Sequence, residues 1–498
     1  MTNVKLLQKD TITLDRFWDI ANDLFHSDRQ VGELRDSCTE DKVNTLLVNY
    51  LTLVCEHCDQ LTTPDTEEQF YNDISEYVTC HRYYRSNMQF CVRKMLSLLT
   101  YSVGCNESNL GLEFDMLDND TREQVNDSIT MNEKLIRIIG WILIVNYQSD
   151  KDAFLQILKD FNGFETLAGV LSNYSRISHN SGDKDPYITN YSPYFELFYE
   201  LCKNYEFEST ELDHVESQLL EYLFESLKVV PKESNILNFM KFKLLLVLNE
   251  QFMVSQFSSA EISHQIENRF FIKMTENGQR FQNFNEVLIL NFNREQDHVL
   301  QILMLKVLYL VFTTSNTCGK FYINDLKLII DIMIRELFNL STVKEEALIN
   351  TYLRVLYPMI LFSSIREEGY KRDSMSEVLR YLVGAEQTSE TTKRLAERCL
   401  VLDFFDEKCG SPLITRSAAP YILSRENSSQ SSVVSEIDSP DSPDSPTAPV
   451  DRSRSNSSIS SQDSKGIHRK RPPPPPPRRY TQRNGSELML SRTKVANK

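Results

Sequence analysis

The stretch "HRKRPPPPPPRRY" near the carboxyl end contains the residues with the clearest binding chemistry. A run of prolines presets the polyproline II helix, in which residues three apart lie on one edge. Aromatic-lined grooves accept such an edge at low entropic cost, and a flanking basic residue pairs with acidic groups beside the groove. The candidate binding residues within 469–479 are Arg469, Arg471, Pro473, Pro474, Pro476, Pro477, Arg478 and Arg479.

Both directions of binding are available to this segment. Arg471 with Pro474 and Pro477 fits one direction, and Pro473 and Pro476 with the arginine that follows the run fit the other. The alternative interpretation is a stiff spacer without a binding role.

Serines of the preceding segment match patterns that protein kinases recognise. Ser439, Ser442 and Ser445 each precede a proline, as proline-directed kinases prefer, and Ser455 follows Arg452 by three residues, as basic-directed kinases prefer. Each phosphate would add about 1.5 to 2 negative charges. Serine-rich segments also contain such patterns by chance.

Cysteine and histidine side chains suggest a metal site as a further possibility. A structural zinc site needs two closely spaced pairs of ligands in loops. Here "NTLLVNYLTLVCEHC" predicts one helix, on which Cys55 and Cys58 share the inner face. We therefore expect reduced core cysteines and no metal. The candidate ligands set aside are Cys55, His57, Cys58, Cys80, His81 and Cys91.

The sequence contains no familiar enzymatic motif. It has no glycine-rich phosphate or dinucleotide loop, no HExxH and no GxSxG, and its eight histidines are scattered. We expect a protein that is not an enzyme and has no catalytic residue and no cofactor.

Three charged residues follow one face of a predicted helix. Lys327, Asp331 and Arg335 are spaced i, i+4, i+8 within "NDLKLIIDIMIRELFNL". They form either a solvated face whose members pair with one another or a surface for a partner.

The candidate cysteines and the charged stripe lie in the body of the chain, residues 1–408. This body has the composition of a helical protein. Only five of the 17 prolines precede residue 410, and the whole chain has 14 glycines. Apolar spacing predicts a helix that starts after Thr13 and another over 324–340 with Asn324 as its N-cap. The stretch 239–248 is apolar almost all round, so its helix must be buried between neighbours.

The length of this body favours a stacked arrangement. It exceeds what one compact core supports, whereas helices stacked side by side need only their neighbours. We find no repeat of fixed period, so the predicted fold class is an all-α, degenerate helical solenoid. Two polar stretches, 106–127 and 175–187, are expected to be loops.

The remaining segment, 409–498, is rich in serine, proline and aspartate. It has too few large apolar residues to offset its ordering entropy by burial, so we expect a disordered Ser/Pro-rich tail.

The charge is divided unevenly between body and tail. Residues 408–498 contain 15 Lys/Arg and 8 Asp/Glu and so have a net charge of +7. Since the whole chain has a net charge of −16, residues 1–407 have a net charge of −23. An acidic body argues against nucleic-acid binding. Apolar runs such as 138–145 are too short for membrane insertion, and no secretory signal is present, so we expect a cytoplasmic protein.

Two stretches of the body, 241–253 ("KFKLLLVLNEQFM") and 286–362 (from "EVLILNFNRE" to "TYLRVLYPMILF"), resemble the leucine-rich domain of the WISH/DIP family. The resemblance implies an armadillo-like helical fold. It also implies a protein of cortical actin patches at sites of endocytosis that binds and activates the Arp2/3 complex without a pre-existing filament and yields linear seed filaments. Fungal members end in a proline-rich segment that binds SH3-domain endocytic coat proteins, as this tail would.

Two interpretations of function remain. Conventional activators of the Arp2/3 complex end in an acidic, tryptophan-containing segment, whereas this chain ends in "LMLSRTKVANK". Activation would therefore come from the folded body, as in the family. The alternative is a non-activating helical scaffold or adaptor that links SH3 proteins to the actin machinery.

Overall fold

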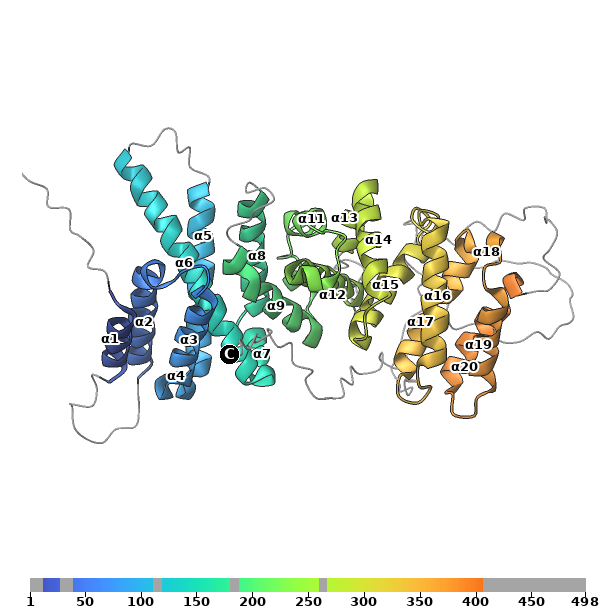
Figure 1. Cartoon of the computed structure of the whole chain (residues 1–498), viewed down its shortest axis with the longest axis horizontal. Helices are drawn as coiled ribbons and strands as arrows, with labels where there is room; N and C mark the ends of the chain where they lie inside the picture. The colour runs from blue at the N-terminus through green and yellow to red at the C-terminus, as the bar shows by residue number, and fades with distance from the viewer. Residues whose placement is uncertain (1–11, 27–38, 111–118, 180–187, 259–266, 406–498) are drawn as a thin grey trace, which may run out of the picture. The chain divides into compact units, whose positions relative to one another are not determined.

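The computed structural model describes residues 12–26, 39–110, 119–179, 188–258 and 267–405, which all lie in one compact unit, Met1–Gln430. Within these ranges the chain forms twenty α-helices and two short 3-10 helices, with no β-strand (Figure 1). The all-α prediction is confirmed. None of the described helices is both long and apolar enough to cross a bilayer.

The helices follow one another with short connections. The first seven are α1 (Leu14–His26), α2 (Glu40–Leu61), α3 (Glu67–Cys80), α4 (Arg82–Ser86), α5 (Met88–Leu110), α6 (Asn119–Ser149) and α7 (Lys151–Asp160). The next seven are α8 (Gly163–His179), α9 (Ile188–Asn204), α10 (Ser209–Leu212), α11 (Ser217–Glu225), α12 (Ile236–Ser258), α13 (Arg269–Glu276) and α14 (Gly278–Phe292). The last six are α15 (His298–Thr313), α16 (Ile323–Asn339), α17 (Glu346–Phe362), α18 (Ile365–Glu368), α19 (Arg372–Gly384) and α20 (Glu390–Leu400). The two 3-10 helices are Lys232–Ser234 and Asp403–Phe405.

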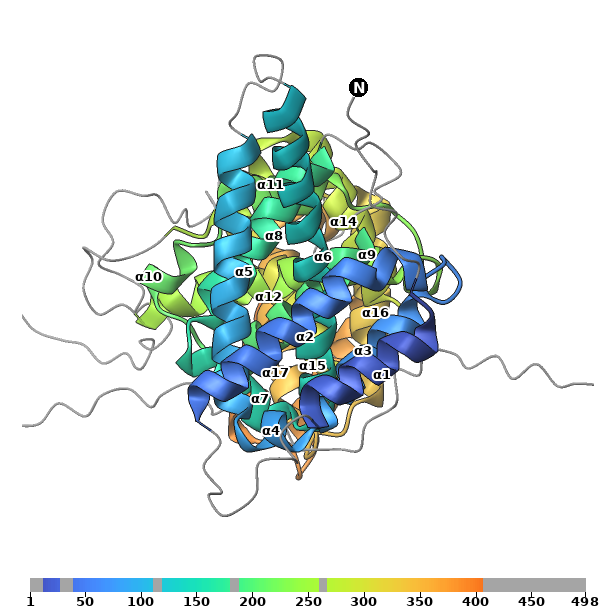
Figure 2. The same ribbon diagram turned by 90° about the vertical axis from the view of Figure 1, so that its left-hand side faces the viewer.

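Two rows of helices run through the described body. In the first row each helix packs on the next one, in the order α3, α6, α9, α12, α15, α17, α20. The second row runs in the same way through α2, α5, α8, α11, α14, α16, α19. From α5 onward, each helix of the second row also packs on the next helix of the first, and Figure 2 shows α5 beside α6 with α2 crossing in front. Because each layer packs on its neighbours, the core continues from layer to layer, as in an armadillo-like solenoid.

The first row forms the centre of this core. The stretch 239–248 lies in α12, and Phe242 and 244–248 are almost completely buried between neighbouring helices, as predicted. The next helix of the row, α15, is buried on most sides as well. Such helices are apolar all round because neighbours cover them on more than one side.

The two predicted N-caps had different outcomes. The Arg16 N–H donates to Thr13 Oγ1 (3.3 Å), so Thr13 caps α1 as predicted. The prediction for Asn324 is wrong, because α16 begins at Ile323 and its N-cap is Tyr322, whose carbonyl oxygen accepts the first helical hydrogen bonds. The side chain of Ile323 packs against the core, which favours the earlier start.

The described parts of the two predicted loops, 106–110, 119–127 and 175–179, are helical, so the loop prediction is wrong for these residues. The structure continues α5 to Leu110, begins α6 at Asn119 and continues α8 to His179, so only 111–118 and 180–187 of these stretches lie outside the described residues. Polar composition alone does not end a helix. Once the buried part of α6, around 136–145, has nucleated the helix, each added residue contributes a hydrogen bond at little further cost.

Candidate functional site

The predicted charged stripe lies on the outer side of α16, a helix of the second row. Lys327 Nζ is 3.0 Å from Glu368 Oε2 at the end of α18, and Arg335 donates to Asn293 Oδ1 (3.1 Å) in the turn between α14 and α15. Asp331 Oδ1 is 2.7 Å from Lys371 Nζ. The three residues therefore do not pair with one another, so the interpretation as a mutually paired face is wrong. Each contacts a residue of another element, and Arg335 also pairs with Glu336 of its own helix.

The partner of Asp331 is a tight turn between α18 and α19. Gly369 and Lys371 both have left-handed backbones, with φ of 61° and 48°. Between them, the Tyr370 hydroxyl donates to the Asp331 carboxylate (3.1 Å). Donation of a hydrogen bond to the Asp331 carboxylate raises the pKa of Lys371 and so stabilises its charged form. Asp331 thus fixes the position of the turn against α16.

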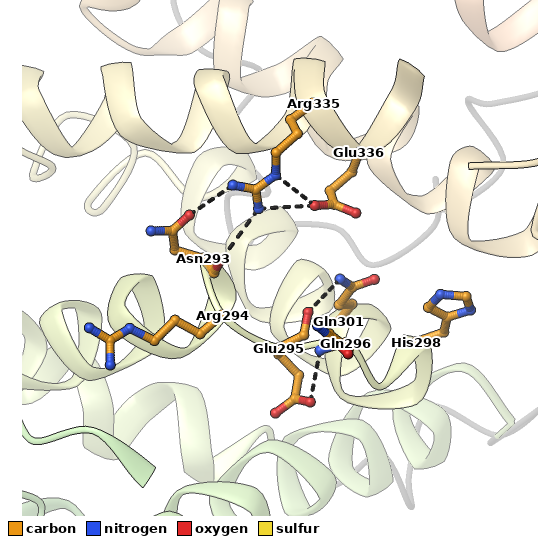
Figure 3. A pocket seen from close by; sticks show the side chains of 8 residues that line it. All are labelled: Asn293, Arg294, Glu295, Gln296, His298, Gln301, Arg335 and Glu336. Atoms are coloured by element: carbon orange, nitrogen blue, oxygen red, sulfur yellow. Dashed lines mark hydrogen bonds and ion pairs between the residues drawn. The ribbon is translucent and has the colours of Figure 1, made fainter. Parts of the chain in front are cut away.

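A polar pocket of about 360 Å³ lies at the other end of the stripe (Figure 3). Its walls are the turn between α14 and α15, the first turn of α15, and Arg335 with Glu336 on α16. The lining residues are Asn293, Arg294, Glu295, Gln296, His298, Gln301, Arg335 and Glu336.

Hydrogen bonds hold the floor of this pocket in place. Glu295 Oε1 accepts the backbone N–H groups of Gln296 (2.9 Å) and Asp297 (3.0 Å), and its Oε2 lies 3.4 Å from Lys232 Nζ. Gln301 Nε2 donates to the Glu295 carbonyl oxygen (2.9 Å). This pocket is not among the sites predicted from the sequence, although the polar run 293–298 between two apolar helices is a signal for it.

The cysteines considered as metal ligands have mostly structural positions. Cys55, Cys58 and Cys91 are buried, and burial raises the pKa of Cys55 to about 12, so its thiol stays protonated. Cys80 corrects the expectation of buried cysteines, because it is exposed at the end of α3 beside Arg85. Within the described ranges, no three His, Cys, Asp or Glu side chains are arranged to hold a metal ion.

The predicted binding and phosphorylation residues of the tail lie outside the described residues. This applies to Arg469, Arg471, Pro473, Pro474, Pro476, Pro477, Arg478, Arg479, Ser439, Ser442, Ser445 and Ser455. It also applies to the expectation that 409–498 are disordered.

The fold and the polar surface of α16 define an all-helical solenoid protein with candidate surfaces for protein partners. Comparison with known proteins makes this class specific: residues 234–375, which contain the pocket and the stripe, match the family described as SPIN90/Ldb17, leucine-rich domain. The resemblance seen in the sequence is confirmed, and this segment is similar to the leucine-rich domain of that family.

Three fungal proteins show the extent of the similarity. "Protein LDB17" of Eremothecium gossypii is 26% identical over 411 residues, which are 77% of this chain and 80% of that protein. "Protein dip1" of Schizosaccharomyces pombe is 27% identical over 347 residues, 65% of this chain and 90% of that protein. "Protein LDB17" of Saccharomyces cerevisiae is 36% identical over 190 residues, 38% of this chain and 37% of that protein. Neither these names nor the family description indicates a catalytic activity.

Proposed function

We propose that this chain binds and activates the Arp2/3 complex without a pre-existing filament, and that the product is a linear filament that seeds later branching at sites of endocytosis. The match of 234–375 to the SPIN90/Ldb17 leucine-rich domain is the observation that carries this proposal. The similarity to two fungal relatives over 80% and 90% of their lengths supports extending it to the whole body.

The activation must come from differential binding. The sequence offers no actin-monomer-binding helix, so the body has to prefer the active arrangement of the Arp2/3 complex over the resting one. A stack of helices with a continuous core suits this task, because a stiff surface favours one geometry of a moving partner.

We place one contact of this partner on the outer side of α16. Lys327, Asp331 and Arg335 lie there inside the family-matching segment, and each remains partly exposed. Their pairing with α18, the turn 369–371 and the α14–α15 turn holds the side chains in place, which reduces the entropy lost on binding.

The tail supplies recruitment in this proposal. SH3-domain endocytic coat proteins bind the prolines and arginines of 469–479 and bring the chain to cortical actin patches. Phosphate on Ser439, Ser442 or Ser445 competes for the nearby arginines and weakens that binding.

The test is actin polymerisation with purified Arp2/3 complex and residues 1–408, followed by pyrene fluorescence and by imaging of single filaments. We expect a shorter lag phase and unbranched filaments that start without a mother filament. The control omits the Arp2/3 complex and should leave the lag unchanged. If the body binds the complex and the lag is untouched, the chain is the passive adaptor instead.

A further inference from the structure

Three exposed arginines lie along the contact between α17 and α20, the last two helices of the first row. They are Arg354 of α17 and Arg394 and Arg398 of α20. Within the described ranges none of the three forms an ion pair with a carboxylate. Arg280 of α14, by contrast, lies 2.8 Å from Glu225 Oε1 at the end of α11. The contact between α17 and α20 therefore presents cations whose carboxylate partners are missing.

Side-chain contacts determine how α17 and α20 are aligned. Thr392 Oγ1 donates to Asn350 Oδ1 (2.7 Å) in the first turn of α20. Further along, Cζ of Arg398 lies 4.1 Å from the centre of the Tyr357 ring. Residue numbers increase in the same direction from the first contact to the second, so the two helices run parallel.

This alignment brings the three arginines to one surface. Arg354 lies one helical turn before Tyr357, and Arg394 lies one turn before Arg398. Residues three or four apart are neighbours on a helix surface, so Arg354 and Arg394 lie beside the contact between the ring and the guanidinium. Packed helices are about 8–10 Å apart and one turn rises about 5.4 Å, so the three side chains leave the helices within an area roughly 10 Å across. We call this surface the arginine face.

The arginine face is a basic surface on an acidic body. Residues 1–407 have a net charge of −23. Glu390 and Glu397 of α20 are exposed as well, but within the described ranges neither forms an ion pair with Arg394 or Arg398. A ligand of this face must therefore be anionic where it meets the arginines and small enough to avoid the acidic residues around them.

A short acidic segment of polypeptide matches these requirements. A guanidinium group is planar and always charged, and it binds a carboxylate through two parallel hydrogen bonds. The ring of Tyr357 holds the guanidinium of Arg398, which reduces the entropy lost on binding. A nucleic acid or a membrane carries its negative charge over a longer surface, which would also meet Glu390 and Glu397.

We propose that the arginine face of α17 and α20 is a docking site for a short Asp/Glu-rich segment of a partner protein. An extended chain advances about 3.3 Å per residue, so a segment of about four to six residues covers the face. The inference rests on Arg354, Arg394 and Arg398 and does not depend on the activity proposed above.

The test measures the fluorescence anisotropy of labelled hexaglutamate, with labelled hexaglutamine as the matched neutral probe. It uses the full chain with the five basic residues of 469–479 replaced by glutamine, because that run would bind an acidic probe as well. We expect hexaglutamate to bind about tenfold more tightly than hexaglutamine, the combined effect of three exposed ion pairs. In about 1 M salt, where the Debye length is about 3 Å, most of this difference should disappear.

Variants of the same chain locate the binding. Arg394→Gln should lower the affinity for hexaglutamate about two- to fivefold, and the triple variant with Arg354→Gln and Arg398→Gln in addition should remove the preference for hexaglutamate. Arg16→Gln removes an exposed arginine of α1 with the same change of charge and should change nothing. Melting temperatures confirm that the variants are folded.

Three results would overturn the proposal. Equal binding of the two probes would mean that the face does not recognise carboxylates. Equal losses in Arg394→Gln and Arg16→Gln would mean that exposed cations attract the probe without a site. Binding to phosphatidylserine vesicles that the triple variant loses, with hexaglutamate left unbound, would assign the face to a membrane surface instead.

Discussion

At the scale of single residues, two glycines of α8 show how differently neighbouring positions are constrained. A Cβ atom at Gly163 would lie 2.5 Å from the Leu158 carbonyl oxygen, whereas one at Gly169 would meet nothing within 4 Å. We expect Gly163→Ala to lower the free energy of unfolding by about 1–3 kcal/mol, because the backbone must shift. Gly169→Ala should raise it by about 0.5–1 kcal/mol through helix propensity.

Urea unfolding of both variants measures this difference. Since the two positions lie in one helix, they act as controls for each other. Similar effects of the two substitutions would show that the approach of Gly163 to Leu158 does not constrain the fold.

A partly buried carboxyl group makes stability depend on pH. Burial raises the pKa of Glu133 in α6 from 4.5 to about 7. The folded state therefore binds the proton more tightly than the unfolded state, and the protein loses stability as the pH rises from 4.5 through 7. Glu133→Gln removes this loss and should stabilise the protein at pH 8 by about 1 kcal/mol after allowance for solvent screening.

Calorimetry at pH 4.5 and pH 8 checks the sign. At pH 4.5 the variant and the wild type should differ little, since Glu133 is then largely protonated in the folded state. Glu123→Gln, an exposed substitution in the same helix, should shift the melting temperature equally at both values. A stabilisation by Glu133→Gln that is the same at both pH values would contradict the assignment.

At the scale of elements, the sequence predicts what periodicity determines. The burial of α12 and the cap at Thr13 follow from local apolar spacing and from one hydroxyl group. The ends of α5 and α6 do not, because packing further along the helix outweighs the polar composition of 106–110 and 119–127.

The candidate site also has one part that the sequence predicts and one part that depends on packing. Spacing alone places Lys327, Asp331 and Arg335 on one face of a helix. Their partners come from the α14–α15 turn, α18 and the turn 369–371, which only the packing of the two rows brings to α16. The arginine face of α17 and α20 has no counterpart in the sequence pattern, since the alignment of two packed helices is a tertiary property.

The proline run is the one element of the tail with its own prediction. Replacing Pro472 to Pro477 with alanine removes the preset polyproline II helix, so pull-down by SH3 domains of endocytic coat proteins should be lost. Replacement of Pro440, Pro443 and Pro446 in the same tail is the matched control and should leave the pull-down intact. Undiminished binding of the six-alanine variant would remove the SH3 assignment.

At the scale of the whole molecule, charge separates two parts to which the proposed function assigns different partners. The acidic residues 1–407 contain the layered helices and the family-matching segment, and the basic run 469–479 lies in the tail. In the proposed function the body activates the Arp2/3 complex, and the tail recruits the chain to sites of endocytosis. The two roles should then be separable by truncation.

Beads coated with an SH3 domain of an endocytic coat protein test this separation. With actin and the Arp2/3 complex, the full chain should assemble filaments at the bead surface, because the tail binds the bead while the body activates the complex. Residues 1–408 should assemble filaments at a similar rate in bulk solution and none at the beads. A chain with the six prolines replaced by alanine should behave as the truncated chain does, which assigns the loss to the proline run rather than to the length of the tail. If residues 1–408 still gather filaments at the beads, the body itself binds the SH3 domain, and the division of roles between body and tail is wrong.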